Sequence, residues 1–203
     1  MRLEEGLAIL GMDIAGPSVR KLLAHAALIE KWNRVYNLTA IRDRDKIVSH
    51  HLLDSLAVLP HIEAPRCADV GSGAGFPGIP LAIARPDWEM VLVESNQKKA
   101  TFLRQAAIEL DLPNVSVFAD RVESLEGSFD LVISRAFSET GEFVRLSRHL
   151  VGRGGHFAAM KGRYPEQELS HLPFGVEVEK VIPLDVPGLE GARHLVIMSM
   201  ETD

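Results

Sequence analysis

Three glycines alternate with small residues at one point in the chain, within the run Asp69-Val70-Gly71-Ser72-Gly73-Ala74-Gly75-Phe76. Glycine lets the backbone turn tightly and lets a ligand lie against the main chain, where any side chain would collide. Glu94 follows the last glycine by 94 − 75 = 19 residues, close to the roughly 20 residues expected for an acid that accepts hydrogen bonds from a ribose diol. The pattern favours a nucleoside-containing cofactor over a purely structural turn.

The spacing of the glycines separates the possible cofactors. A nicotinamide fingerprint has its third glycine three positions after the second, and that position is Phe76 here. No GKS or GKT follows the glycines, which argues against a nucleoside triphosphate site. The alternating glycines look instead like the S-adenosylmethionine loop of class I methyltransferases, and nearby acids suit a ligand that is cationic at sulfur. The residues expected at this cofactor are Asp69, Gly71, Gly73 and Glu94.

A parallel sheet is the structure that would position these residues. From Cys67 onwards the short apolar runs CADV, EMVLVE, VSVF and FDLVIS alternate with helical stretches such as Asn96 to Leu110. This alternation is typical of parallel strands joined by crossover helices. Turn residues between the last two strand candidates permit an antiparallel pair at one edge of the sheet. The late strand candidates are Gly155–Met160, Val176–Leu184 and His194–Met200.

The first third of the chain predicts helices. Apolar residues recur at helical spacing over residues 19–29. Asp43 and Asp45 can cap a second helix that continues until Pro60 stops it. The expected organisation is a helical segment over residues 1–64 and an S-adenosylmethionine-binding domain over residues 65–203.

Composition limits the class of protein. The chain has 203 residues, of which 46% are hydrophobic, enough to bury one good-sized core. Its net charge is −6, the wrong sign for a protein that coats nucleic acid, so any RNA has to be bound by local basic patches. Glu4 and Glu5 stand where a signal peptide would need basic residues, and no apolar run approaches membrane-spanning length. We expect a cytoplasmic protein that binds no membrane and needs no obligate protein partner.

Five longer runs carry a resemblance to a known family: ADVGSGAGFPGIPLAIARPDW, KWNRVYNLTAIRD, HHLLDSL, ISRAF and GARHLVIM. Over nearly its whole length the chain resembles the bacterial small-subunit ribosomal RNA guanine-N7 methyltransferases, also known as glucose-inhibited division protein B. FPGIP after the glycines and HHLLDS before them are specific to that family.

The resemblance implies both a fold and an activity. The fold is α/β, a class I (Rossmann-like) methyltransferase fold with a mostly parallel seven-stranded sheet, an antiparallel edge strand and an N-terminal helical extension. The activity is transfer of a methyl group from S-adenosylmethionine to N7 of a guanine in small-subunit (16S) ribosomal RNA. Ribosomal RNA or the small ribosomal subunit would be the partner.

Carried over position by position, the resemblance places Gly71 and Phe76 at the cofactor, with Val122 and Glu123 after the third strand and Arg135 after the fourth. These positions agree with an open parallel sheet, in which an adenine edge lies at the carboxyl ends of the strands. The closing motif over residues 191–194 reads GARH, where an acid is expected before the arginine.

The target atom determines which side chains the reaction needs. Guanine N7 carries an in-plane lone pair and no proton, so attack on the sulfonium methyl group needs alignment and desolvation, not a strong base. Arg135 is expected to position the substrate, and no general base is expected. Covalent methylation of cytosine would need a thiolate, but Cys67, the only cysteine, begins its strand and is expected in the core. The run over residues 134–137 is SRAF, which lacks the two prolines usual for amino methylation.

Basic side chains near these motifs are candidates for RNA contacts. Lys161 and Arg193 lie at the ends of late strands and can form a positive rim beside the site. Lys31 and Arg42 belong to a basic cluster around Trp32. The cluster can bind RNA, or its aromatic residues can instead pack the helices onto the sheet. The expected RNA-binding residues are Lys31, Arg42, Lys161 and Arg193.

A metal site is not expected. His50 and Asp54 share a helical face at positions i and i+4, but no third ligand is evident, so a capping or packing role is favoured.

Two other functions stay open. A methyltransferase for small molecules would not need the basic cluster around Trp32. A non-catalytic RNA- or ribosome-binding module would keep the pocket only as a sensor. Turnover with ribosomal RNA separates the module from an enzyme.

Overall fold

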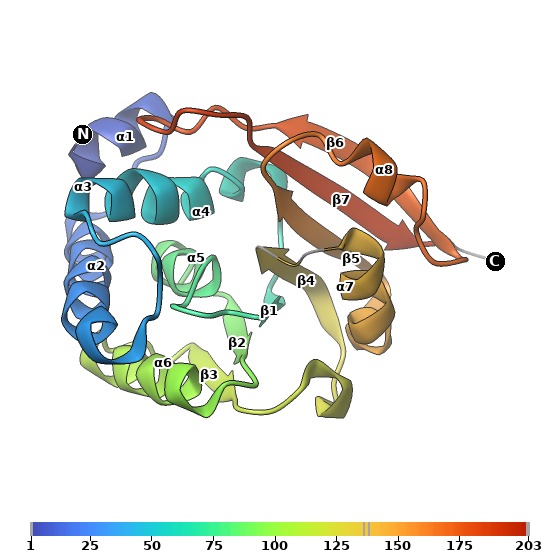
Figure 1. The fold of residues 1–203 in the computed structure, drawn as a ribbon, viewed down its shortest axis with the longest axis horizontal. Coiled ribbons are helices and arrows are strands. Elements are labelled where there is room, and N and C mark those ends of the chain that lie inside the picture. Colours follow the sequence, from blue (N-terminus) through green and yellow to red (C-terminus); the bar gives the residue numbers. More distant parts are fainter. Residues whose placement is uncertain (1, 136, 138, 202–203) are drawn as a thin grey trace.

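A seven-stranded sheet runs through the molecule with helices on both faces (Figure 1). The structure is a computed structural model, and it describes residues 2–135, 137 and 139–201. In chain order the strands are β1 (Arg66–Val70), β2 (Glu89–Val93), β3 (Val115–Phe118), β4 (Phe129–Arg135), β5 (Val151–Lys161), β6 (Val176–Pro183) and β7 (His194–Met200).

The strand order in the sheet is β3-β2-β1-β4-β5-β7-β6. Neighbouring strands from β3 to β5 run parallel, and β7 runs antiparallel to both β5 and β6. The antiparallel pair expected near one edge is therefore confirmed, as is the parallel sheet expected from alternating apolar and helical runs.

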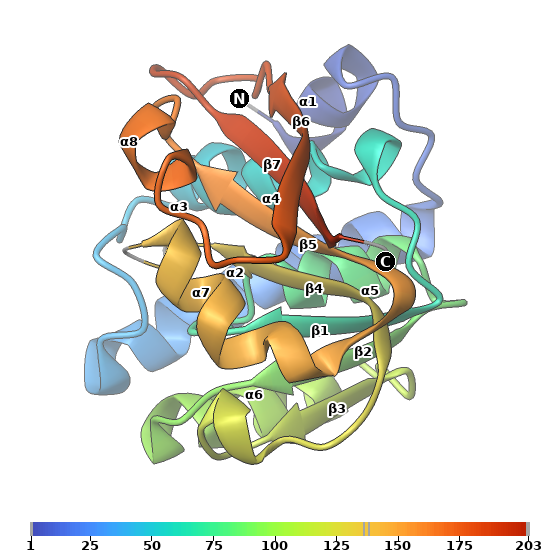
Figure 2. The ribbon, with the colours of Figure 1, turned by 90° about the vertical axis from the view of Figure 1, so that its right-hand side faces the viewer.

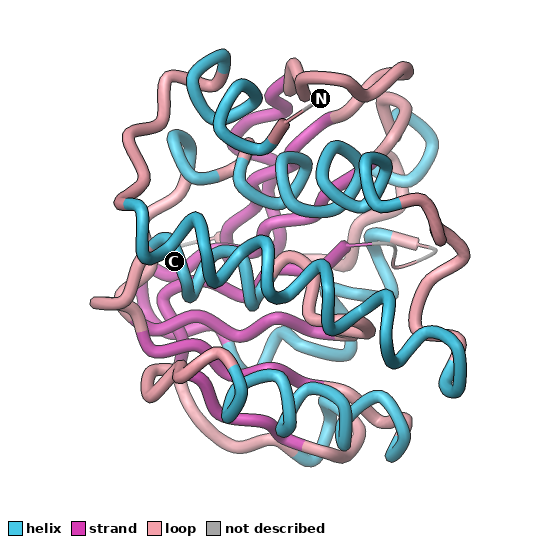
Figure 3. The backbone as a smooth tube through the Cα atoms, turned by 90° about the vertical axis from the view of Figure 1, so that its left-hand side faces the viewer, coloured by secondary structure: helices cyan, strands magenta, loops and turns pink. Residues whose placement is uncertain are grey.

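Two helical layers enclose the sheet. Figure 3 shows the first layer in front of the strands, and Figure 2 shows α7 on the opposite face. The first layer contains α1 (Leu3–Ile9), α2 (Gly16–Tyr36), α3 (Arg44–Ile47), α4 (Asp54–Leu56), α5 (Gly78–Ala84) and α6 (Gln97–Glu109). The second contains α7 (Thr140–Ser147) and the short α8 (Glu166–Leu169).

Successive residues of a strand face opposite helical layers, because side chains alternate between the two faces of the sheet. In β1, Cys67 packs into the core beneath α2, α5 and α6, whereas Ala68 and Val70 pack into the core beneath α7. Burial on both faces explains why the strands read as unbroken apolar runs. Cys67 is fully buried, and burial raises the pKa of its thiol, so the expected core role is confirmed.

The helical stretch expected from Asp43 to Pro60 forms, but it is not one regular helix. Asp43 caps it, because its Oδ1 accepts a hydrogen bond from the main-chain N–H three residues later at 3.1 Å. A π-helical turn (Val48–Leu53) separates α3 from α4, and the helix ends at Leu56. The expectation that Pro60 stops the helix is wrong, because Pro60 lies in a separate 3-10 turn, where its missing N–H costs little.

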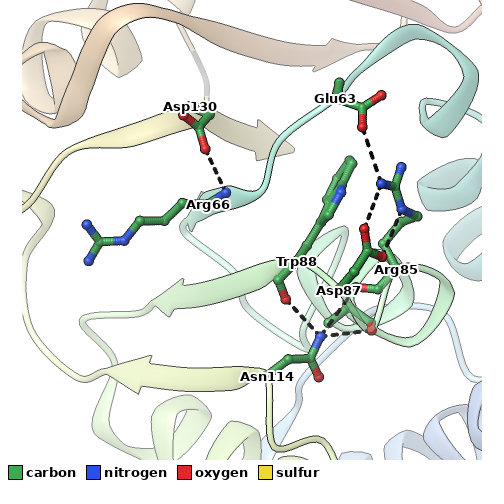
Figure 4. Close-up of polar contacts among 8 residues, drawn as sticks. Glu63, Arg66, Arg85, Asp87, Trp88, Asn114 and Asp130 are labelled. Carbon is green, nitrogen blue, oxygen red and sulfur yellow. Dashed lines mark hydrogen bonds and ion pairs between the residues drawn. The ribbon is translucent and has the colours of Figure 1, made fainter.

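The amino ends of the strands are closed by polar contacts (Figure 4). The Asn114 side-chain amide donates to the carbonyls of Trp88 at 3.0 Å and Ala82 at 3.1 Å, which ties the start of β3 to the end of α5. The Arg66 main-chain N–H donates to Asp130 Oδ2 at 2.8 Å. The guanidinium of Arg85 lies over the Trp88 ring, 4.5 Å from its centroid. These contacts leave the carboxyl ends of the strands as the open edge.

Gly78, the first residue of α5, provides a test of this packing. A Cβ at Gly78 would lie 2.3 Å from Leu92 Cδ2 and 2.7 Å from Asp69 Oδ2, and both side chains are fully buried. Because overpacking a core forces side chains out of their rotamers, Gly78→Ala should lower the free energy of unfolding by about 1–3 kcal/mol. Urea denaturation measures this loss.

Gly16→Ala is the control, because it also places alanine in a first helical turn. Its nearest neighbour would be the Arg20 side chain at 3.7 Å, and alanine is the better helix former by up to about 1 kcal/mol. This variant should be as stable as the parent or slightly more so. Equal stability of the two variants would contradict the close packing at Gly78.

Candidate active site

The carboxyl ends of β1 and β4 meet at the point where the strand order reverses. The chain leaves β1 towards β2 on one side and returns to β4 on the other, and ligands bind at such a point in open α/β sheets. A cavity of about 190 Å³ opens here. Its wall includes Gly71, Glu94, Val122, Glu123 and Phe137. The structure thus brings together four residues that the sequence predicts at the cofactor, and it adds Phe137.

The glycine turn after β1 needs a backbone that only glycine adopts freely. Gly71, Gly73 and Gly75 have φ values of +76°, +57° and +89°, in the left-handed region that a Cβ disfavours. The N–H groups of Gly71 and Ser72 donate to the carbonyl of Val93 at 2.9 and 3.1 Å. The turn is therefore fastened to the end of β2, beside Glu94.

Glu94 joins the glycine turn to α6. Its Oε2 accepts from the Gly73 N–H at 2.9 Å, and its Oε1 accepts from the Asn96 N–H at 2.8 Å. The side chain is almost fully buried yet lines the cavity. A carboxylate held in this way is oriented in advance for hydroxyl donors.

Asp69 lies behind the turn and does not edge the pocket as expected. It is fully buried, and its Oδ2 accepts from the Gly78 N–H at 3.0 Å. Burial raises the pKa of this carboxyl to about 7, and the hydrogen bond from Gly78 opposes the rise. Asp69 therefore supports the turn from behind and is not part of the cavity wall.

Phe76 also turns away from this cavity, although it was expected at the cofactor. Its buried ring lies between His25 and His51, with centroid distances of 4.9 and 4.7 Å. The guanidinium of Arg135 lies 4.9 Å from the same ring. The ring faces the core because a buried apolar side chain is stabilised there, and it supports Arg135.

Arg135 lines a second cavity of about 360 Å³ and not the first one. This placement differs from the expectation that Arg135 also contacts the cofactor, because its guanidinium is paired with Asp54. The other charged or ionisable residues in the wall of the second cavity are His50, His51, Asp54, Lys161, Arg193 and His194. Its basic character suits a phosphate or a purine acceptor edge.

Asp54 holds both arginines of the second cavity. Its Oδ2 lies 3.2 Å from Arg135 Nη1, and its Oδ1 lies 3.2 Å from Arg193 Nε. Arg135 Nη1 also donates to the carbonyl of His50 at 3.2 Å. Burial raises the pKa of Asp54, and the two guanidiniums oppose that rise. The sequence indicated Asp54 only as a partner of His50. Spacing along the chain does not show that Asp54 meets Arg135 at the end of β4 and Arg193 beside the start of β7.

Lys161, expected to contact RNA, is already paired. Its Nζ lies 2.5 Å from Glu168 and donates to the Phe137 carbonyl at 3.2 Å, and its side chain is 10% exposed. Glu168 also accepts from the Thr140 N–H and hydroxyl at 2.7 and 2.6 Å. Lys161 therefore ties β5 to the segment after β4. Ala136 of the ISRAF motif lies outside the described residues.

The N-terminal basic cluster separates into packed rings and exposed charges. Trp32 stacks on Tyr36 with a centroid distance of 5.2 Å and meets Phe102 of α6 edge-on at 5.7 Å. The rings therefore pack α2 against α6, as the packing alternative expects. Lys31 and Arg42 are exposed, and Arg42 lines a cavity of about 260 Å³ beside α2.

His51, one of three histidines in the wall of the second cavity, has a packing role. His51 shares a hydrogen bond with the Thr39 hydroxyl at 2.8 Å, and burial lowers the pKa of its ring to about 3.

Within residues 2–135, 137 and 139–201, no group of three His, Cys, Asp or Glu side chains could hold a metal ion. Over the same residues, no helix combines the length and apolar character needed to cross a membrane.

Solved structures share the fold at low sequence identity. The chain matches the 16S rRNA methylase RmtB with a TM-score of 0.59 and 16% identity, over 98% of this chain and 80% of that one. It matches the ribosomal protein L11 methylase of Lactobacillus delbrueckii subsp. bulgaricus with a TM-score of 0.57 and 15% identity, over 79% and 80%. These matches confirm the class I methyltransferase fold.

Sequence relatives are much closer. Ribosomal RNA small subunit methyltransferase G of Chromobacterium violaceum is 54% identical over 202 residues, covering 98% of this chain and 97% of that protein. The protein of the same name from Laribacter hongkongensis is 52% identical over 200 residues, with the same coverage. The family model described as GidB, rRNA small subunit methyltransferase G, matches residues 18–196. The resemblance found in the five sequence runs is thereby confirmed, and the chain belongs to the rRNA small subunit methyltransferase G (GidB) family.

Proposed function

We propose that this protein transfers a methyl group from S-adenosylmethionine to N7 of a guanine in 16S ribosomal RNA. One observation carries the proposal. A glycine turn with an oriented carboxylate, Glu94, lines one cavity, and a basic cavity with Arg135 opens beside the same strand ends. Methyl transfer needs such a pair of sites, one for the donor and one for the acceptor. The names of the relatives supply the substrate class.

The first cavity fits the cofactor. Bound S-adenosylmethionine supplies an electrophilic methyl group on a sulfonium centre. The Glu94 carboxylate would accept hydrogen bonds from the ribose hydroxyls, and Val122 and Glu123 would border the adenine. The turn at Gly71 and Gly73 lets the ligand approach the main chain, and Asp69 maintains the turn from behind.

The second cavity fits the target nucleotide. Asp54, the Phe76 ring and the His50 carbonyl hold the Arg135 guanidinium in one orientation. A fixed guanidinium can hold O6 of the purine or a neighbouring phosphate while N7 stays free for attack. Burial lowers the pKa of His51 to about 3, which makes its ring a weak base, and N7 carries no proton that a base would have to remove.

RNA would be held by local charges, because the net charge of the chain is −6. Lys31 and Arg42 are exposed on the N-terminal helical layer. Arg193 and Lys161 lie in the wall of the second cavity with acidic partners. We infer that the substrate is ribosomal RNA or the small ribosomal subunit, that residues 1–64 form its helical platform, and that the protein acts in the cytoplasm without an obligate protein partner.

The first prediction concerns the cofactor. The protein alone should bind S-adenosylhomocysteine, and Glu94→Ala should weaken that binding by roughly tenfold to a hundredfold, because charge-assisted hydrogen bonds contribute about 1.5–3 kcal/mol. Isothermal titration calorimetry measures both affinities. Glu89→Ala is the matched control, since Glu89 begins the same strand at its opposite, exposed end. Equal losses in the two variants would contradict the role of Glu94.

The second prediction concerns the substrate. Arg135→Ala should raise the activation free energy of methyl transfer at saturating cofactor and RNA by about 2–4 kcal/mol, as expected for removal of one preorganised donor. Arg135→Lys should restore only part of the rate, since a point charge cannot reproduce the planar fork. Single-turnover assays measure the rates. Arg145→Ala removes an exposed arginine of α7 and should have no effect. An unchanged rate for Arg135→Ala would overturn this assignment.

The third prediction concerns pH. The single-turnover rate should stay nearly flat between about pH 6.5 and 8.5, because N7 carries no proton and needs no base. A catalytic histidine of ordinary pKa would give a rate that rises through about pH 6.5. Burial raises the pKa of Asp69 to about 7, so any change of rate with pH that this carboxyl causes should disappear in Asp69→Asn. A steep slope that persists in this variant would show that the reaction uses a base.

A further inference from the structure

The glycine turn lacks one hydrogen bond that a continuous helix would make. In an α-helix each N–H donates to the carbonyl four residues earlier. Ile79 follows this rule, since its N–H donates to the Gly75 carbonyl at 2.8 Å. Gly78 does not, because its N–H donates to the Asp69 carboxylate at 3.0 Å. The carbonyl of Ala74 therefore loses the donor that helical geometry would supply.

His25 of α2 supplies the missing donor. Its Nε2 lies 2.9 Å from the Ala74 carbonyl, although 49 residues separate the two in sequence. The imidazole is fully buried, and Ala74 is 5% exposed, so no solvent can replace the bond. A carbonyl oxygen only accepts, so Nε2 must carry the ring proton. In the described structure the other ring nitrogen, Nδ1, is buried without a partner.

The shape of the surroundings holds the ring against the turn. A Cβ at Gly75 would lie 3.3 Å from His25 Nε2, so glycine allows the imidazole this close an approach. The Phe76 ring lies against His25 at 4.9 Å, and Phe102 of α6 lies at 6.4 Å. Burial lowers the pKa of His25 to about 4, which keeps the ring neutral at physiological pH.

We propose that His25 is a positioning residue for the cofactor turn. The His25 N–H and the Asp69 carboxylate satisfy the two main-chain groups that would otherwise bond to each other, and together they keep the turn open. The N-terminal helical layer thereby helps to hold the turn that borders the cofactor cavity at Gly71. The inference rests on the proposed use of S-adenosylmethionine, and its tests separate the two.

The first test needs neither a ligand nor a variant. Long-range ¹H–¹⁵N correlation spectra of the ligand-free protein distinguish the two neutral tautomers of a histidine. His25 should carry its proton on Nε2 at pH 7. A neutral ring with its proton on Nδ1 would overturn the proposal, because Nε2 could then not donate to the Ala74 carbonyl.

The second test compares two substitutions by calorimetry with S-adenosylhomocysteine. His25→Leu fills the space without a donor and should weaken binding about tenfold. His25→Gln places an amide N–H near the position of Nε2 and should bind within about threefold of the parent. In steady-state assays His25→Leu should raise KM for the cofactor, with kcat and KM for RNA unchanged. A merely structural role would not produce rescue by glutamine or this split.

Asn33→Ala is the control for lost stability. Asn33 is also buried in α2 and makes two hydrogen bonds to the main chain of Thr39, away from the turn. The Asn33→Ala protein should have a lower melting temperature than the parent and should bind S-adenosylhomocysteine with unchanged affinity. A folded His25→Leu protein with parental affinity, or glutamine no better than leucine, would overturn the proposal. Failure of the parent itself to bind would refute the proposed cofactor instead, with the tautomer still deciding the role of His25.

Discussion

Several main-chain polar groups in and beside the glycine turn have their hydrogen-bond partners on other elements, and the site is built around this requirement. Buried N–H and carbonyl groups that lack partners cost about as much as a lost hydrogen bond. The Val93 carbonyl, the carboxylates of Glu94 and Asp69, and the imidazole of His25 satisfy four parts of one turn. They come from β1, the end of β2 and α2, so the turn has its shape only when these elements are packed together.

A second constraint is electrostatic. The buried Asp54 carboxylate faces the guanidiniums of Arg135 and Arg193 at 3.2 Å each. A buried ion pair contributes little net stability, because desolvation offsets the attraction, but loss of one partner leaves an uncompensated charge. The cluster therefore does more to fix positions than to stabilise the fold. It joins α4 to the end of β4 and the start of β7, and it orients the side chain assigned to the substrate.

The two ends of the sheet divide stability from function. At the amino ends, Asn114 and Arg66 make hydrogen bonds that tie neighbouring segments together and close the edge (Figure 4). At the carboxyl ends, the polar groups of Glu94 and Arg135 face cavities. Such a division follows from a parallel sheet, where all carboxyl ends meet at one edge and loops can vary there without disturbing the core.

The sequence by itself determined those features of the fold and the site that depend on residues close to one another along the chain. Alternating glycines, the acid 19 residues later and the period of apolar runs all depend on neighbours along the chain. They predicted the strands, the turn at Gly71, the cavity wall at Glu94 and the buried Cys67. The helix after Asp43 was predicted as well, although its π-helical turn was not, because a register change inside a helix leaves no mark in apolar spacing.

Only the tertiary structure decided which side chains meet across the layers. His25 reaches Ala74, and Arg135 reaches Asp54 over 81 residues of sequence. Phe76 faces the core and not the cavity, and Lys161 is paired with Glu168. Spacing along the chain cannot show these contacts, because they depend on how the N-terminal helices dock on the sheet and on which buried charges and main-chain groups are then left to satisfy one another.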